Sequence, residues 1–202
     1  VSGSATNVTN LVSSSGVVAS DTTGVGSARS GLAAAGYGGD KAIFGFGYGN
    51  ATGIPGDTRP EHTSMTNLVS NTGVMASDTT GVGLKRFRLA ATGYGGDKAI
   101  FGFGSTGGNS NLTSITNLVS NAGVVATDTT GVGSARQRLS AASYGGDKAI
   151  FGFGYGEGTG FPGDTRPDLT SITNLVSNAG VVASDTTGVG TARTHSASAK
   201  YG

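Results

Sequence analysis

The chain has 202 residues, a length that suits one domain of ordinary size, and its formal net charge is only +1. Charged residues make up 12% of it, cysteine is absent, and no apolar run of about 18 residues occurs. These features exclude disulfide bonds, thiolate metal sites, a membrane-spanning helix in this sequence and the basic stripe with which proteins neutralise nucleic-acid phosphates.

Glycine occupies 38 positions, against a usual share of about 7%. Inside a helix each glycine costs about 1 kcal/mol relative to alanine, so the composition disfavours long helices. It favours tight turns and strands whose backbones approach closely. The surface that remains, rich in Ser, Thr, Asn and Gly, suits neutral partners such as sugars, or is simply the polar side of a sheet.

One segment, Thr-Asn-Leu-Val-Ser, recurs along the chain and begins at Thr9, Thr66, Thr116 and Thr173. The spacings of 57, 50 and 57 residues differ because an insertion over 48–60 and 155–167 is shortened in the middle copy. Such a period is typical of repeat architectures. We therefore predict one repeat domain over 1–202, composed of a partial unit (1–26), full units over 27–83, 84–133 and 134–190, and the first strand of a further unit (191–202).

Each full unit contains short apolar runs separated by turn residues. In the last full unit they predict strands a to d over 138–144, 148–154, 171–177 and 181–184. Alternation in strand b places Ala149, Phe151 and Phe153 on one face. Four short strands cannot bury their faces alone, so successive units must stack.

The unit SARSGLAAAGYGGDKAIFGFGYG (27–49), followed by a loop and TNLVSNTGVMASDT, resembles a blade of a kelch-type β-propeller. The matching features are an arginine that opens strand a, a Gly-flanked aromatic stretch in strand b and apolar strands after the loop. The amino-acid sequence of the repeat also resembles repeat proteins of bacteriophages and environmental viral sequences, over almost the whole chain. The resemblance implies an all-β, propeller-like array of four-stranded antiparallel blades, a virion-associated or extracellular location, and no catalytic residues.

The units add up to about four blades, and strand b of the last blade is missing from the sequence. Either a permuted, nearly four-bladed ring closes by bringing both ends into one blade, or the chain is part of a larger or multi-chain ring. A β-solenoid or open stack of the same units is the alternative fold. An unpaired sheet edge favours self-association.

An Asp-Thr-Thr-Gly linker recurs in each unit, eight residues before an arginine. Aspartate in such a turn accepts backbone N–H bonds, and we expect the arginine to clamp the adjacent blade through a carboxylate. The alternative is a ring of repeated sites that hold sugar hydroxyls. The blade-stabilising candidates are Asp21, Asp78, Asp128, Asp185, Arg29, Arg86, Arg136 and Arg193.

The two long insertions are the first candidates for ligand or subunit contact, because one complete unit lacks them. Their charged residues are Asp57, Arg59, Asp164 and Arg166. Pro-Gly makes a tight turn in each insertion, and the arginine before the next proline is held extended.

Enzyme signatures are absent from the sequence. No Cys, His and Asp pattern has metal-ligand spacing, and His62 and His195 occupy non-equivalent positions that predict surface residues. We predict a non-enzymatic structural component of a virion or extracellular surface fibre, without cofactor or metal; the alternative is a lectin-like, carbohydrate-binding module for attachment. Expected partners are further copies, other chains of the assembly and glycans, without nucleic acid or membrane insertion.

Overall fold

The computed structural model describes residues 5–49, 61–157 and 167–200, and over these residues the protein is all-β. The 15 strands within these ranges form five antiparallel sheets of three strands each. Across the described ranges, no helix has the length and hydropathy needed to span a bilayer.

Three larger sheets share one construction, one for each full repeat, and their strands follow chain order. They are β2 (Ala33–Tyr37), β3 (Lys41–Gly45) and β6 (Thr66–Val69); β7 (Ala90–Tyr94), β8 (Lys98–Gly102) and β9 (Thr116–Val119); and β11 (Ser140–Tyr144), β12 (Lys148–Gly152) and β15 (Thr173–Val176). The register is identical in all three, since strand b pairs Ala-Ile-Phe-Gly with Thr-Asn-Leu-Val of strand c. These sheets are the predicted strands a, b and c.

The predicted fourth strand is reduced to two isolated bridges in each repeat. In the first full repeat these are Val69↔Met75 and Thr66↔Thr79. Thr66 and Val69 are three residues apart, whereas their partners Met75 and Thr79 are four residues apart. One extra residue on the second side is the geometry of a β-bulge. The extra residue interrupts the ladder, so strand d does not form a continuous strand. At the bulge, the Ala76 carbonyl accepts a hydrogen bond from the Asn67 side-chain amide, at 3.2 Å.

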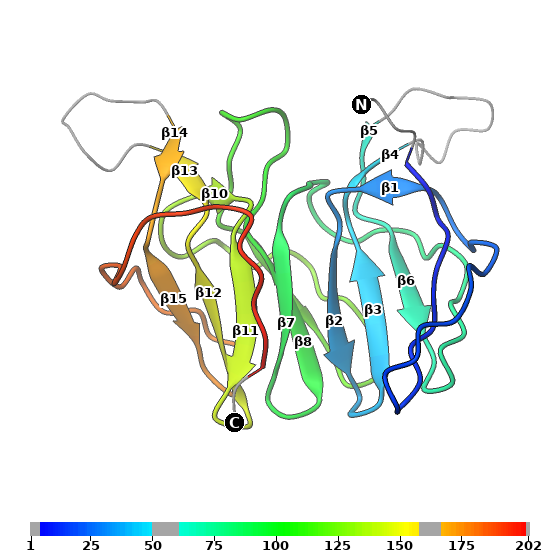
Figure 1. Ribbon diagram of the computed structural model, residues 1–202. Coiled ribbons are helices and arrows are strands. Elements are labelled where there is room, and N and C mark those ends of the chain that lie inside the picture. The colour runs from blue at the N-terminus through cyan, green and yellow to red at the C-terminus, as the bar shows by residue number, and fades with distance from the viewer. Residues whose placement is uncertain (1–4, 50–60, 158–166, 201–202) are drawn as a thin grey trace.

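Two small sheets were not predicted, and they arise at the long insertions. They are β1 (Arg29–Ser30), β4 (Tyr48–Gly49) and β5 (Glu61–His62); and β10 (Arg136–Gln137), β13 (Tyr155–Glu157) and β14 (Pro167–Leu169). In each, the first stem of the insertion is the central strand and pairs with the second stem and with the residues before strand a. Figure 1 shows both small sheets at the same end of the molecule.

Strand b ends two residues earlier than predicted. Phe46, Phe103 and Phe153 have φ between 62° and 64°, in the left-handed region that side chains other than Gly seldom adopt. This turn of the backbone stops the alternation, so Phe153 does not continue the face of Ala149 and Phe151. The following glycines carry the turn further, with φ of 103° to 110°.

Successive repeats stack through their first strands. β7 lies beside both β2 and β11, with the other two sheets on opposite sides of it in Figure 1. Backbone bonds tie neighbouring repeats at both ends of these strands. Gly38 N–H donates to Asp97 C=O at 2.6 Å at one end, and Arg88 N–H donates to Gly31 C=O at 2.7 Å at the other.

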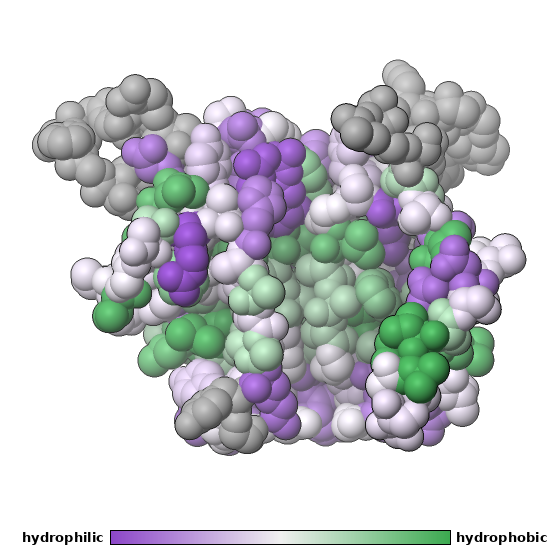
Figure 2. Space-filling view, in the orientation of Figure 1, coloured by the Kyte–Doolittle hydropathy of each residue, from purple (hydrophilic) through white to green (hydrophobic). Residues whose placement is uncertain are grey.

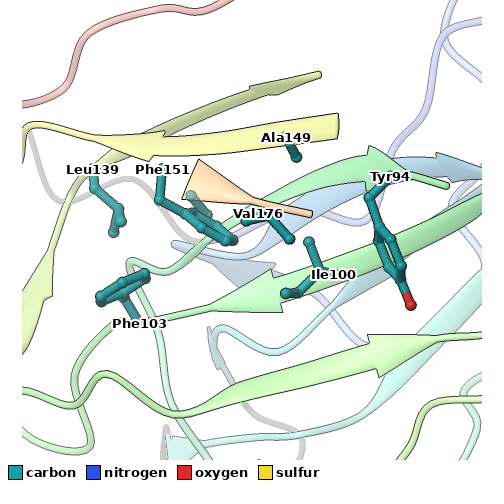
Figure 3. Close-up of a cluster of buried hydrophobic side chains, with 8 residues drawn as sticks. Tyr94, Ile100, Phe103, Leu139, Ala149, Phe151 and Val176 are labelled. Carbon is teal, nitrogen blue, oxygen red and sulfur yellow. The ribbon is translucent and has the colours of Figure 1, made fainter. Parts of the chain in front are cut away.

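The core lies between the stacked sheets and contains few large side chains. Phe101 of β8 is fully buried against the preceding repeat, where a Cβ on Gly45 would lie only 3.0 Å from its ring. Phe151 of β12 contacts Gly102 in the same way, at 2.8 Å, within the cluster drawn in Figure 3. Glycine at these positions therefore permits the close approach of one sheet to the next.

Candidate functional site

A buried arginine stands at the centre of a cluster that recurs in every full repeat. Arg86 is fully buried, donates through Nη2 to Asn117 Oδ1 at 2.5 Å, and lies 3.7 Å from an Asp128 oxygen. Its guanidinium also stacks on the Phe46 ring, 4.4 Å from the centroid. The equivalent clusters are Arg29 with Asn67 and Asp78, and Arg136 with Asn174, Asp185 and Phe103.

Each of these arginines pairs with a carboxylate of its own repeat, and not with one of the adjacent blade as the sequence predicted. Arg29 pairs with Asp78, at 3.8 Å, in its own repeat, and not with Asp21, which precedes it by eight residues in the neighbouring repeat. The carboxylate therefore closes the first and last parts of one repeat onto each other. For Arg86 and Arg136, the link to the preceding repeat is the cation–π contact with the ring of Phe46 or Phe103.

The aspartate of each cluster holds the linker that leads into strand a. Asp185 accepts hydrogen bonds from the Ser134 amide and hydroxyl at 2.9 and 2.6 Å, and from Asn174 Nδ2 at 2.9 Å. Burial by itself raises the pKa of Asp185, but these hydrogen bonds and the charge of Arg136 outweigh it and lower that pKa. Burial also lowers the pKa of Arg136 to about 10, so the guanidinium keeps its charge at neutral pH.

The remaining two candidates, Asp21 and Arg193, belong to incomplete clusters. Asn10 donates to Asp21 Oδ1 at 2.8 Å, and both side chains are exposed. Arg193 stacks on Phe153, 3.6 Å from the centroid, and is also exposed. Asp57, Arg59, Asp164 and Arg166, the candidates in the insertions, lie outside the described residues.

Aromatic side chains gather at one stem of the first insertion. Tyr48 of β4, His62 of β5 and Phe87 lie together, with ring centroids 5.2 Å apart for Tyr48–His62 and 4.5 Å apart for His62–Phe87. The Arg88 guanidinium stacks on Phe87 at 4.4 Å. These four residues line an open cavity of about 450 Å³, and Tyr48 is 38% exposed. The first two full repeats together therefore form a concave aromatic site, here called the aromatic pocket.

The aromatic pocket depends on a local difference between repeats. Phe87 occupies a position that holds Ser30 and Gln137 in the other full repeats. The residue after this position has a left-handed backbone in all three full repeats. It is Gly31 in the first and Arg88, with φ of 55°, in the second. The left-handed turn directs the Arg88 amide to the preceding repeat and leaves its side chain over Phe87. The occurrence of Phe87 in a single repeat is the sequence signal that could have indicated this pocket.

His62 lies partly buried in this pocket and not on the open surface that the sequence predicted. Burial lowers its pKa, the positive charge of Arg88 lowers it further, and Glu61 partly opposes both effects. The imidazole is therefore neutral at pH 7 and can both donate and accept a hydrogen bond. Among the described residues, no group of three or more His, Cys, Asp and Glu side chains could hold a metal ion.

No protein-family model matches this sequence, and a search of curated proteins gives no match.

We predict that Arg136→Ala destabilises the protein by about 3 kcal/mol or more, because it leaves the buried Asn174 and the Asp185 carboxylate without their cation. Arg193→Ala is the matched control, since Arg193 makes an exposed cation–π contact worth about 0.5–1 kcal/mol. Urea unfolding followed by circular dichroism compares the two variants. Equal losses would contradict the structural role of the complete cluster.

We predict that the His62 ring titrates below 6.5 and that Arg88→Ala raises its pKa. A lowered folded-state pKa means that the unfolded chain binds the proton more tightly, so stability falls as the pH drops through 6.5 toward the folded pKa. Proton NMR of the ring measures the titration, and His195→Gln assigns the signal. An unchanged His62 titration in Arg88→Ala would refute the charge coupling.

Proposed function

We propose that the chain is a non-enzymatic structural module of a virion or extracellular surface fibre, in which the repeats form propeller-like blades. The observation that carries this proposal is the recurrence of one Arg–Asn–Asp cluster, with the same partners, in all three full repeats. A group needed in every unit serves the architecture, whereas a catalytic site requires a single asymmetric set of groups. Adjacent first strands that tie neighbouring sheets support an arrangement of blades around a common axis.

We predict that antibodies raised against the purified chain label intact particles or extracellular fibres without permeabilisation. Labelling confined to the cell interior would refute the proposed location. Class averages of the purified chain by electron microscopy address the architecture separately. Blades set radially around one axis are expected, and a straight stack of units would refute the propeller-like arrangement.

Carbohydrate binding is the second candidate function, and the aromatic pocket is the observation that favours it. Ligand sites are typically concave, with apolar and aromatic walls and a few polar groups that fix orientation. Tyr48 and Phe87 provide flat apolar faces, while Arg88 and His62 provide hydrogen-bonding groups beside them. A sugar ring with one apolar face and several hydroxyls fits this combination.

We predict that glycan-array hits of the wild-type chain are weakened at least 10-fold by Tyr48→Ala and by Phe87→Ala, a loss of about 1.4 kcal/mol. Tyr155→Ala is the matched control, because Tyr155 holds the position of Tyr48 in the last full repeat, where Gln137 replaces Phe87. Circular dichroism verifies that each variant is folded. Equal binding by all three variants would exclude the pocket as the glycan site.

A further inference from the structure

One extended segment of the structure keeps an open edge. Residues 9–12, Thr-Asn-Leu-Val, are the counterpart of β6, β9 and β15, and they bridge to the following segment at Thr9↔Thr22 and Val12↔Val18. In the full repeats, the other edge of this strand pairs with β3, β8 or β12. Among the described residues, none pairs with that edge of Thr9–Val12.

Exposure of the side chains on this edge differs sharply from that of their counterparts. Val12 is 64% exposed, whereas Val119 and Val176 are 0% and 1% exposed. Asn10 is exposed, whereas Asn117 and Asn174 are fully buried. Thr9–Val12 therefore carries the side chains of an interior strand on an open surface.

An unfilled space lies beside Phe44 of β3. In the next two repeats, Phe101 and Phe151 hold the same position and are fully buried against a glycine of the preceding repeat. Phe44 is only partly buried, and it lines a cavity of about 210 Å³ together with Thr9 and Val25. Strand b of the preceding repeat covers Phe101 and Phe151.

A second unfilled space lies at Gly152, on the last full repeat. Added Cβ atoms at Gly45 and Gly102 would meet the rings of Phe101 and Phe151, but at Gly152 only the Thr173 methyl lies within 4 Å, at 3.3 Å. A cavity of about 140 Å³ lies here, lined by Gly152, Phe153 and Ala197 among others. In the two preceding repeats, the equivalent space holds a phenylalanine ring of the next repeat's strand b.

We propose that these features form one docking groove for an extended strand with the repeat's own sequence, Asp-Lys-Ala-Ile-Phe-Gly, supplied by another copy of the repeat. The strand would lie antiparallel to Thr9–Val12, with Ala opposite Val12 and Phe opposite Asn10, as the equivalent residues pair in the full repeats. Its Phe fills the cavity at Gly152, and its Gly covers Phe44. Figure 1 shows the C-terminal segment and the N-terminal hairpin on either side of the groove, and Figure 2 shows apolar surface in the hollow between them.

The recognition is the addition of a strand to a sheet edge, in which backbone hydrogen bonds supply affinity and side-chain cavities supply specificity. Docking also completes the recurrent cluster. Asn10 and Asp21 supply the amide and carboxylate that Arg193 lacks among the described residues, and the three side chains are exposed until the groove is filled. The proposal goes beyond the proposed function and is independent of any glycan.

A fluorescent peptide, Gly-Gly-Asp-Lys-Ala-Ile-Phe-Gly-Phe-Gly, tests the groove by anisotropy titration against the whole 202-residue chain. We expect saturable binding, and at least a 10-fold loss when the first Phe of the peptide is replaced by Ala. Val12→Lys should cause a similar loss. Val17→Lys is the matched control, because Val17 is 65% exposed and its counterparts Val74 and Val124 are equally exposed at 66% and 65% in repeats whose edge is filled.

Hydrogen exchange locates the bound peptide. Protection of the amides of Thr9–Val12 is expected, without change at Thr116–Val119. Absence of saturable binding, equal binding by Val12→Lys and Val17→Lys, or protection confined to the full repeats would each overturn the proposal. Both valines are exposed in the folded chain, so neither substitution is expected to unfold it.

Discussion

The contact between a phenylalanine ring and a glycine of the preceding repeat sets the distance between sheets, and the other features of the fold depend on it. Phe101 reaches Gly45 because strand b presents no side chain there, and any Cβ would clash with the ring. A close approach then lets short strands with small side chains bury one another. The protein thus builds a core without tryptophan and with only eight phenylalanines in 202 residues.

The left-handed turn at Phe46, directly after Gly45, also positions the arginine cluster of the next repeat. Phe46 adopts a left-handed backbone, which directs its ring toward Arg86 of the next repeat. A buried guanidinium loses its hydration, and Asn117, Asp128 and the ring replace only part of it. Buried ion pairs of this kind often add little net stability compared with apolar packing. We therefore infer that the cluster mainly fixes the register between neighbouring repeats and contributes less to the strength of their association.

The candidate binding surfaces lie where the repeats differ. The Arg–Asn–Asp clusters recur in all three full repeats, whereas Phe87 and Arg88 occur together in one of them and create the aromatic pocket with Tyr48 and His62. The open edge at Thr9–Val12 is a second departure, because interior side chains stand exposed there. A repeat scaffold tolerates such local changes, since each unit contacts only its neighbours.

The sequence alone determined the all-β class and the first three strands of each full unit. Short apolar runs between Gly, Asn and Asp are local signals, and near-identical copies repeat them. It could not determine which aspartate each arginine meets, because Arg29 and Asp78 are 49 residues apart while Asp21 is nearer in the chain. Only the tertiary structure decided that pairing, the bulge that removes strand d and the assembly of the aromatic pocket. The pairing and the pocket result from the packing of segments distant in sequence, which propensity and spacing do not encode. The bulge is a local departure from the regular ladder, between Val69 and Met75, that the alternation of side chains does not encode.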